Sequence, residues 1–261
     1  MSTLLAKNIH TLATLDDARR EIKDAAIFVR DRVIEAVGTL DDMPAQTADT
    51  VLDLRDHVVL PGLINTHHHM CQSLTRAIAQ DSELFDWLTA LYPIWSRLTG
   101  EAIYVSAKLA MAELILSGCT TSSDHLYIYP NDAMLDDEIR AAQEIGIRFH
   151  AARGSMTVGQ SQGGVPPDRV VEKEDAVLRD TRRVIEQYHD PERYAMLRIV
   201  VAPCSPFTVS QSLMRESADL ARAYGVHLHT HLAENDKDIA YSHEVFGQRP
   251  GEYVESVGWV G

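Results

Sequence analysis

The sequence has 261 residues, 45% of them hydrophobic, so it can bury a large core in one or two domains. Its 24 basic and 38 acidic residues leave a net charge of −14, which argues against a nucleic acid polymer as partner. No segment approaches the roughly 18 consecutive apolar residues that cross a bilayer. The three cysteines form no C-x-x-C pair, and we therefore expect a soluble cytoplasmic protein without a membrane partner.

The first 58 residues predict a small β module. Apolar and polar residues alternate over residues 25–30 and 33–37, and charged, Asp-rich turns separate these stretches. Such short alternating segments are typical of small antiparallel strands. We therefore expect residues 1–58 to form a partial β-sandwich.

From there onward, short apolar runs alternate with helical patterns. The runs cover residues 58–65, 119–125, 147–153, 197–203 and 226–232. Apolar residues recur at helical spacing in three intervening segments, each followed by a glycine: residues 101–117, 133–145 and 210–224, followed by Gly118, Gly146 and Gly225. This alternation predicts an α/β fold with a parallel sheet, either doubly wound or a barrel. Catalytic residues are then expected at the carboxyl ends of the strands.

One connection after an expected strand is long and rich in glycine, serine and proline. It covers residues 155–168, S-M-T-V-G-Q-S-Q-G-G-V-P-P-D. Its length favours two interpretations equally, a loop over the site or a solvated connection without substrate contact.

Three consecutive histidines follow the run of residues 58–65. Because side chains alternate along a strand, His67 and His69 point to one side and His68 points to the other. Burying imidazoles without partners is costly. His67 and His69 can instead converge on one metal ion.

A second group of histidines lies in residues 226–234, V-H-L-H-T-H-L-A-E. In an extended strand, His227, His229 and His231 share one face and the apolar residues share the other. His231 is nearest the carboxyl end, and Glu234 follows where the strand gives way to a loop. The segment therefore offers a third ligand and an adjacent proton carrier.

These donors favour zinc, although iron or manganese can occupy similar ligands. A bound metal ion lowers the pKa of a water molecule toward neutrality. Glu234 is then expected to take a proton from this water and deliver it to the substrate. A lone inward-facing histidine is more often a core residue, but two histidine groups at strand ends favour the metal site.

The residues P-G-L-I-N-T-H-H-H (61–69) and H-T-H-L-A-E (229–234) resemble the amidohydrolase superfamily, in its branch of metal-dependent aminohydrolases acting on purines, pyrimidines and triazines. Five further segments are similar to those of the 8-oxoguanine deaminases: N-T-H-H-H-M-C-Q-S-L-T-R (65–76), L-Y-P-I-W (91–95), S-G-C-T-T (117–121), R-G-S-M (153–156) and A-P-C-S-P-F (202–207). The resemblance extends along nearly the whole chain. It implies that His67, His69 and His231 are metal ligands, that Glu234 shuttles the proton, and that His68 is a neighbour.

Four further residues are candidate substrate-binding groups. Gln72 resembles the glutamine that holds the purine edge in guanine deaminases, with a helix-surface role as the alternative. Cys204 lies near the position where guanine deaminases have an arginine, and this departure favours an oxidised purine or another ring. Arg153 can pair with a substrate oxygen or extend to water. For His125, the sequence favours a role in the site and a structural role equally.

The sequence predicts about five strand and helix units, whereas a closed (β/α)8 TIM-type barrel has eight. The resemblance implies that further strands carry another histidine and an aspartate that complete the metal site. We therefore expect residues 59–261 to be the N-terminal part of such a barrel, and the complete enzyme to be a homo-oligomer.

The leading interpretation is hydrolytic deamination of an aminated purine-like ring, namely 8-oxoguanine, with release of ammonia. The expected partners are this small heterocycle and water. Hydrolysis of a substituted triazine and deamination of guanine are alternatives with the same chemistry. A catalytically incomplete fragment that needs a complementing polypeptide is an alternative of a different class.

Overall fold

A computed structural model describes residues 1–260 and divides the chain into two compact units, Met1–Gly62 and Leu63–Gly261. The first unit is a five-stranded sheet: β1 (Thr3–Ala13), β2 (Glu21–Arg30), β3 (Val33–Thr39), β4 (Thr50–Asp53) and β5 (Val58–Val59). The strands β1, β2 and β3 are antiparallel neighbours, whereas β4 and β5 run parallel to β1. The stretches expected to be antiparallel strands, residues 25–30 and 33–37, lie in β2 and β3.

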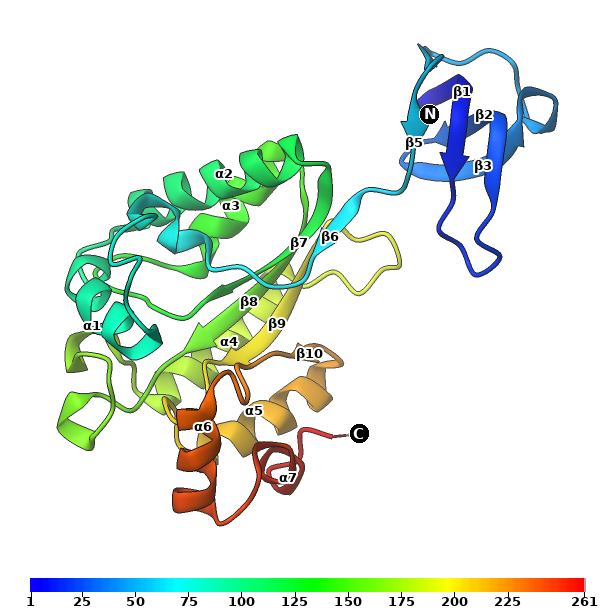
Figure 1. The fold of residues 1–261 in the computed structure, drawn as a ribbon. Helices are drawn as coiled ribbons and strands as arrows, with labels where there is room; N and C mark the ends of the chain where they lie inside the picture. The colour runs from blue at the N-terminus through cyan, green and yellow to red at the C-terminus, as the bar shows by residue number, and fades with distance from the viewer. Residues whose placement is uncertain (261) are drawn as a thin grey trace. The chain divides into compact units, whose positions relative to one another are not determined.

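The second unit contains a curled, entirely parallel sheet in the order β10-β9-β8-β7-β6 (Figure 1). Its strands are β6 (Leu63–Asn65), β7 (Cys119–Leu126), β8 (Arg148–Ser155), β9 (Leu197–Pro203) and β10 (His227–Leu228). The strands β7, β8 and β9 are within two residues of the expected runs at each end. The predicted α/β class with a parallel sheet is therefore confirmed.

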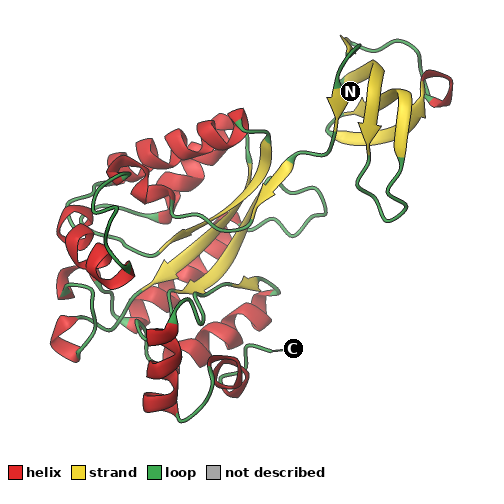
Figure 2. Ribbon diagram, viewed as in Figure 1, coloured by secondary structure: helices red, strands yellow, loops and turns green. Residues whose placement is uncertain are grey.

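Helices separate these strands along the chain and cover the sheet (Figure 2). They are α1 (Leu84–Trp95), α2 (Gly100–Leu116), α3 (Leu135–Ile145), α4 (Glu174–Tyr188), α5 (Gln211–Tyr224), α6 (Asp236–Tyr241) and α7 (Pro250–Ser256). The predicted helices correspond to α2, α3 and α5. The patterns described above did not predict α1, α4, α6 or α7.

The glycines after α2, α3 and α5 have the conformation that ends a helix. Gly118, Gly146 and Gly225 have φ angles of 90°, 81° and 66°. This left-handed region is costly for residues that carry a Cβ atom. Each glycine therefore turns the chain from a helix into the following strand, as its position in the sequence predicts.

Two strands are shorter than expected. Residues 58–65 separate into β5 and β6 because Pro61, which lacks an N–H group, and Gly62 lie between them. The segment 226–232 is a strand only over His227–Leu228. Beyond it, the His229 N–H still donates to the Val201 carbonyl at 3.0 Å, but no regular ladder continues.

The core of the second unit lies between the sheet and its helices. It buries Leu91, Trp95, Ile103, Met111 and Phe149 to 0% exposure. Burial of this apolar surface stabilises the sheet and places the carboxyl ends of its strands at one edge. Within residues 1–260, no helix combines the length and hydrophobicity needed to cross a membrane.

Candidate metal centre

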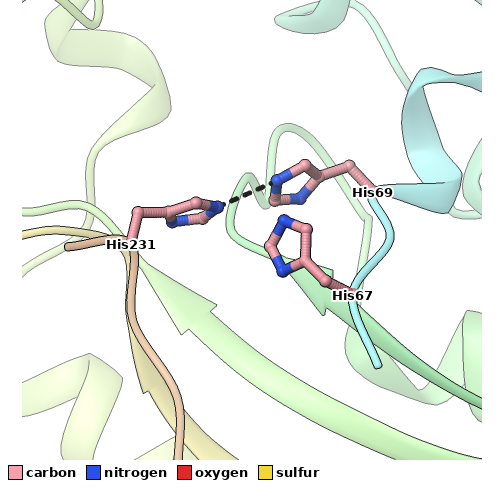
Figure 3. Close-up of side chains that lie close together, drawn as sticks. All are labelled: His67, His69 and His231. Carbon is pink, nitrogen blue, oxygen red and sulfur yellow. Dashed lines mark hydrogen bonds between the residues drawn. The ribbon is translucent and has the colours of Figure 1, made fainter. Parts of the chain in front are cut away.

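His67, His69 and His231 converge beyond the carboxyl ends of β6 and β10 (Figure 3). One ring nitrogen of each histidine lies within 4.8 Å of the corresponding atoms of the other two. The His69 and His231 rings are stacked with centroids 5.0 Å apart, and their Nε2 atoms are separated by 3.0 Å. The predicted ligands from two distant parts of the sequence therefore share one site.

Strand β7 holds the histidine segment in place. The His125 N–H donates to the His68 carbonyl at 2.8 Å, and the Met70 N–H donates to Asp124 Oδ1 at 2.5 Å. The Ser106 hydroxyl of α2 donates to the Met70 carbonyl at 2.7 Å. Asp124 and Ser106 are fully buried, so these hydrogen bonds are shielded from water.

Backbone carbonyls orient two of the three imidazoles. His69 Nδ1 lies 2.7 Å from the His125 carbonyl oxygen, and His231 Nδ1 lies 2.6 Å from the Cys204 carbonyl oxygen. A carbonyl can only accept, so each Nδ1 carries the proton and each Nε2 keeps its lone pair. This arrangement, in which a carbonyl selects the tautomer, is typical of histidines that bind a metal.

The site favours neutral histidines. Burial, together with the neighbouring His231, lowers the pKa of His69 to about 3. Burial also lowers the pKa of His67 and of His231. Three neutral imidazoles fit a divalent cation, because nitrogen ligands at about 2.0–2.1 Å in a tetrahedral site lie roughly 3.3 Å apart.

A fourth histidine approaches the group. His229 Nε2 lies 3.0 Å from His67 Nδ1, and the His229 ring stacks on His125 at 5.1 Å. His227, which was expected on the same strand face, lies beside His150 at a centroid separation of 6.3 Å and is exposed. His227 and His229 line the same pocket, next to Thr121 and Ser123 of β7.

His125, Cys204 and His231 form a second group with metal-ligand spacing. However, the His125 Nε2 donates to the Ala202 carbonyl at 2.9 Å, and burial raises the pKa of Cys204 to about 12. A protonated thiol is a poor metal ligand. The three-histidine group therefore has the better donor set.

A cavity of about 380 Å³ lies beside the histidines. Predicted residues that line it are His67, His69, His231, Gln72, Cys204 and Glu234, and its other walls are mainly apolar and aromatic side chains such as Trp87, Leu88, Tyr92, Tyr127, Val165 and Phe207. Tyr127, which the sequence analysis missed, accepts a hydrogen bond from Gln72 Nε2 at 2.9 Å. Its position directly after the β7 run is the signal that could have identified it.

Glu234 has an environment suited to proton transfer. Burial raises its pKa, and the nearby carboxylate of Asp238 raises it further. The backbone N–H of Glu234 donates to Asp238 Oδ2 at 3.1 Å, which holds the residue at the start of α6. A carboxyl group with a raised pKa beside a cavity is a candidate general acid and base.

The structure corrects the expectation for Arg153. Its guanidinium is 2% exposed and donates to Glu172 at 2.7 and 2.8 Å and to Asp180 at 2.9 Å. It also stacks over the Tyr129 ring at 3.9 Å and does not line the cavity. Two carboxylates already satisfy this cation, so it is not available to a substrate oxygen.

His125 and His68 also lie outside the cavity. His125 is 0% exposed beneath the other histidines, with ring centroids 4.7 Å from His231. His68 Nδ1 lies 3.9 Å from Asp124 Oδ1. His125 therefore packs against the predicted ligand histidines and does not reach the cavity.

The carboxyl group of Glu138 lies next to that of Asp124, which the sequence did not indicate. Glu138 of α3 is 0% exposed, and both of its carboxyl oxygens are buried without a hydrogen-bond partner, as is Asp124 Oδ2. Burial raises the pKa of Asp124 to about 7, and burial together with Asp124 raises the pKa of Glu138. Both groups therefore favour the protonated form more than an exposed carboxyl group does.

A family model described as the amidohydrolase family matches residues 58–259. The chain is 46% identical over 209 residues to 8-oxoguanine deaminase of Pseudomonas aeruginosa, an alignment covering 78% of this chain and 46% of that protein. It is 37% identical over 275 residues to hydroxydechloroatrazine ethylaminohydrolase of a Pseudomonas species, which covers 100% of this chain and 57% of that protein. The chain thus spans about half the length of the curated relatives that it matches.

Solved structures show the same architecture. A zinc-complexed atrazine chlorohydrolase from Arthrobacter aurescens superimposes with a TM-score of 0.90 at 35% identity, covering 98% of this chain and 58% of that chain. A triazine hydrolase variant superimposes with a TM-score of 0.93 at 34% identity, covering 99% of this chain and 59% of that chain. The predicted barrel-type architecture is confirmed, and the zinc-complexed neighbour supports a divalent metal.

Proposed function

This chain belongs to the amidohydrolase family, and on that basis we propose that it provides the metal-binding part of an enzyme that hydrolytically deaminates an aminated purine-like ring, with 8-oxoguanine as the first candidate. The convergence of His67, His69 and His231 beside a cavity that also contains Glu234 carries this proposal. In the reaction, water adds an oxygen to the ring carbon that carries the amino group, and ammonia leaves.

We propose zinc as the metal. His67, His69 and His231 hold it, and when bound it acts as a Lewis acid that polarises the substrate and makes water more acidic. The zinc-complexed neighbour and the all-nitrogen donor set of the three histidines support zinc over manganese, which favours oxygen ligands.

The chain's own residues then have separate tasks. Glu234 takes a proton at its carboxylate oxygen and delivers it to the leaving amino group. Gln72 contacts the polar edge of the ring, while Trp87 and Phe207 contact its apolar surfaces and exclude water. Cys204 is a neutral thiol in the cavity wall, which suits an oxidised ring better than it suits an anion.

The five parallel strands form an open sheet, and a closed barrel of this class has eight. We propose that further β/α units, which supply another histidine and an aspartate, complete both the barrel and the metal site. The complete enzyme is proposed to be a homo-oligomer. Three buried thiols support a reducing compartment, and we propose the cytoplasm.

Hydrolysis of a substituted triazine is the second candidate. The three triazine-related proteins described above are 34–37% identical to this chain and cover 98–100% of it. Both candidates require the same metal and the same Glu234. The substrate edge that contacts Gln72 distinguishes them.

Ammonia release by the completed enzyme from 8-oxoguanine, guanine, isocytosine and hydroxylated triazines tests the proposal, together with elemental analysis of the purified protein. We expect bound zinc and the highest kcat/KM with 8-oxoguanine. A triazine as the best substrate would replace the leading candidate with the second. Guanine as the best substrate would show that Cys204 does not exclude it.

A further inference from the structure

Tyr127 stands at the cavity wall directly after β7. The residue is 4% exposed, and its ring packs edge-on against His69 with centroids 5.0 Å apart. Its phenol oxygen accepts a hydrogen bond from Gln72 Nε2 at 2.9 Å. Both side chains line the cavity that contains the ligand histidines.

The direction of this hydrogen bond leaves two groups free. A phenol carries a single proton, and because its oxygen accepts from Gln72, that proton must be donated elsewhere. Within residues 1–260, the Tyr127 hydroxyl donates to no protein atom, and Gln72 Oε1 accepts from none. The neighbouring phenols differ, because Tyr129 donates to the Leu126 carbonyl at 2.9 Å and Tyr92 donates to Met156 Sδ at 3.5 Å.

A free donor and a free acceptor therefore lie side by side at one wall of a largely apolar cavity. Buried polar groups are rarely left without partners, because an unpaired donor or acceptor costs about 1–3 kcal/mol. A ligand that fills the cavity has to present the complementary pair, an acceptor next to a donor. A lactam edge, in which a ring carbonyl stands beside a ring N–H, has this pattern.

We propose that Gln72 and Tyr127 act as one recognition pair for the lactam edge of the substrate. The Tyr127 hydroxyl donates to the ring carbonyl, and Gln72 Oε1 accepts from the adjacent ring N–H. The inference rests on the proposed function and narrows its substrate class to aminated rings that carry an oxo group beside a protonated nitrogen. Rings that carry only amino groups at this edge leave the phenol proton unpaired and are rejected.

Two ring analogues and four proteins test this pair. The substrates are 8-oxoguanine and 2,6-diaminopurine, which carries amino groups but no ring carbonyl and therefore has no lactam edge. Wild type is compared with Tyr127→Phe, Gln72→Leu and the control Tyr129→Phe, which removes a partly buried phenol that does not line the cavity. Binding is followed through quenching of the fluorescence of Trp87, which does line the cavity, and turnover is followed through ammonia release.

We expect Tyr127→Phe to weaken binding and kcat/KM for 8-oxoguanine by about 10- to 100-fold, the range set by one unpaired buried partner. The analogue should change less than about threefold, and Tyr129→Phe should leave the ratio between the two rings unchanged. Gln72→Leu should show the same selective loss for 8-oxoguanine as Tyr127→Phe.

The two parts of the proposal fail in different ways. Selective binding of 8-oxoguanine without ammonia release would overturn the deaminase assignment and support lactam recognition. Equal losses for both rings in Tyr127→Phe, or binding of neither ring by the wild type, would overturn the recognition pair. Retained metal content in all four proteins shows that the changes do not act through the histidine site.

Discussion

The Nε2 atoms of His69 and His231, which are 162 residues apart in the sequence, lie 3.0 Å from each other with both Nδ1 atoms directed at backbone carbonyls. Two lone pairs facing each other at this distance repel, unless a proton or a cation lies between them. Burial disfavours the proton, because it lowers the pKa of His69 to about 3. A divalent cation removes the repulsion, so this pair connects the fold directly to metal binding.

The first prediction concerns metal retention. His67→Ala and His231→Ala should each lower the bound zinc at least tenfold, because each removes a nitrogen from the three-histidine group. His68→Ala should keep the metal, because its Nδ1 faces Asp124 at 3.9 Å. Elemental analysis after gel filtration is the measurement. Equal metal loss in His67→Ala and His68→Ala would show that the two side chains do not point to opposite sides, as predicted.

The second prediction separates proton transfer from metal binding. Glu234→Gln should lower kcat by about 100- to 10,000-fold, which is the range for loss of a general acid and base. Its zinc content should equal that of the wild type, because Glu234 is not among the three histidine ligands. Ammonia release and elemental analysis on the same preparation provide the check. Activity within a fewfold of the wild type would assign the proton transfer to another group.

The third prediction concerns acid stability of the metal-free chain. The pKa is lowered to about 3 for His69 and to about 4 for His229, against 6.5 in an unfolded chain. Below about pH 6.5 the unfolded chain therefore binds more protons, so the free energy of unfolding falls as the pH drops toward 4. Thermal unfolding should shift down by several degrees between about pH 7 and pH 5.

A His229→Gln variant provides the comparison, since it removes one of these titrations. Its melting temperature should fall less over the same interval. A melting temperature of the wild type that is independent of pH between 7 and 5 would show that the histidines are not held neutral by burial.

The fourth prediction concerns the buried pair of Asp124 and Glu138. Burial raises both pKa values, so the stability that the pair contributes is present in acid and is lost as the pH rises through about 7. Glu138→Gln keeps a donor for Asp124 and removes one titrating group, so its free energy of unfolding should fall less than that of the wild type as the pH rises from about 4 to about 7. Glu138→Leu removes the donor and should destabilise the chain by about 2 kcal/mol.

Denaturant unfolding at several pH values is the measurement. The matched control is Glu216→Gln, a change at an exposed residue of α5. If Glu138→Gln and Glu216→Gln had the same pH dependence as the wild type, burial would not raise the pKa of Glu138.

The fifth prediction tests the structural assignment of Arg153. Arg153→Ala should lower the free energy of unfolding by about 3–5 kcal/mol, because it leaves Glu172 and Asp180 facing an empty, partly buried site. The exposed Arg215→Ala variant should cost less than about 0.5 kcal/mol. Denaturant unfolding measures both. If Arg153→Ala raised KM without changing the free energy of unfolding, Arg153 would be a substrate-binding residue after all.

The α/β class, the strands β7, β8 and β9, and the three candidate metal-binding histidines could all be predicted from the amino-acid sequence. These features are local, because an apolar run, a helix followed by glycine and an alternating H-x-H pattern each depend on a few neighbouring residues. The pattern of residues 226–234 also offered His231 as a third ligand with Glu234 as an adjacent proton carrier, and the resemblance implied the same roles. These predictions needed no knowledge of contacts between distant segments.

Which polar side chains reach the cavity depends on how distant segments pack against one another. Arg153 and Tyr127 both follow apolar strand residues, yet Arg153 is paired with Glu172 and Asp180 whereas Tyr127 lines the cavity beside Gln72. The hydrogen bond between Gln72 and Tyr127 joins residues 55 positions apart, and the ion pairs of Arg153 span 19 and 27 positions. Their energies depend on burial and on partners brought together by packing, and no local pattern in the sequence contains that information.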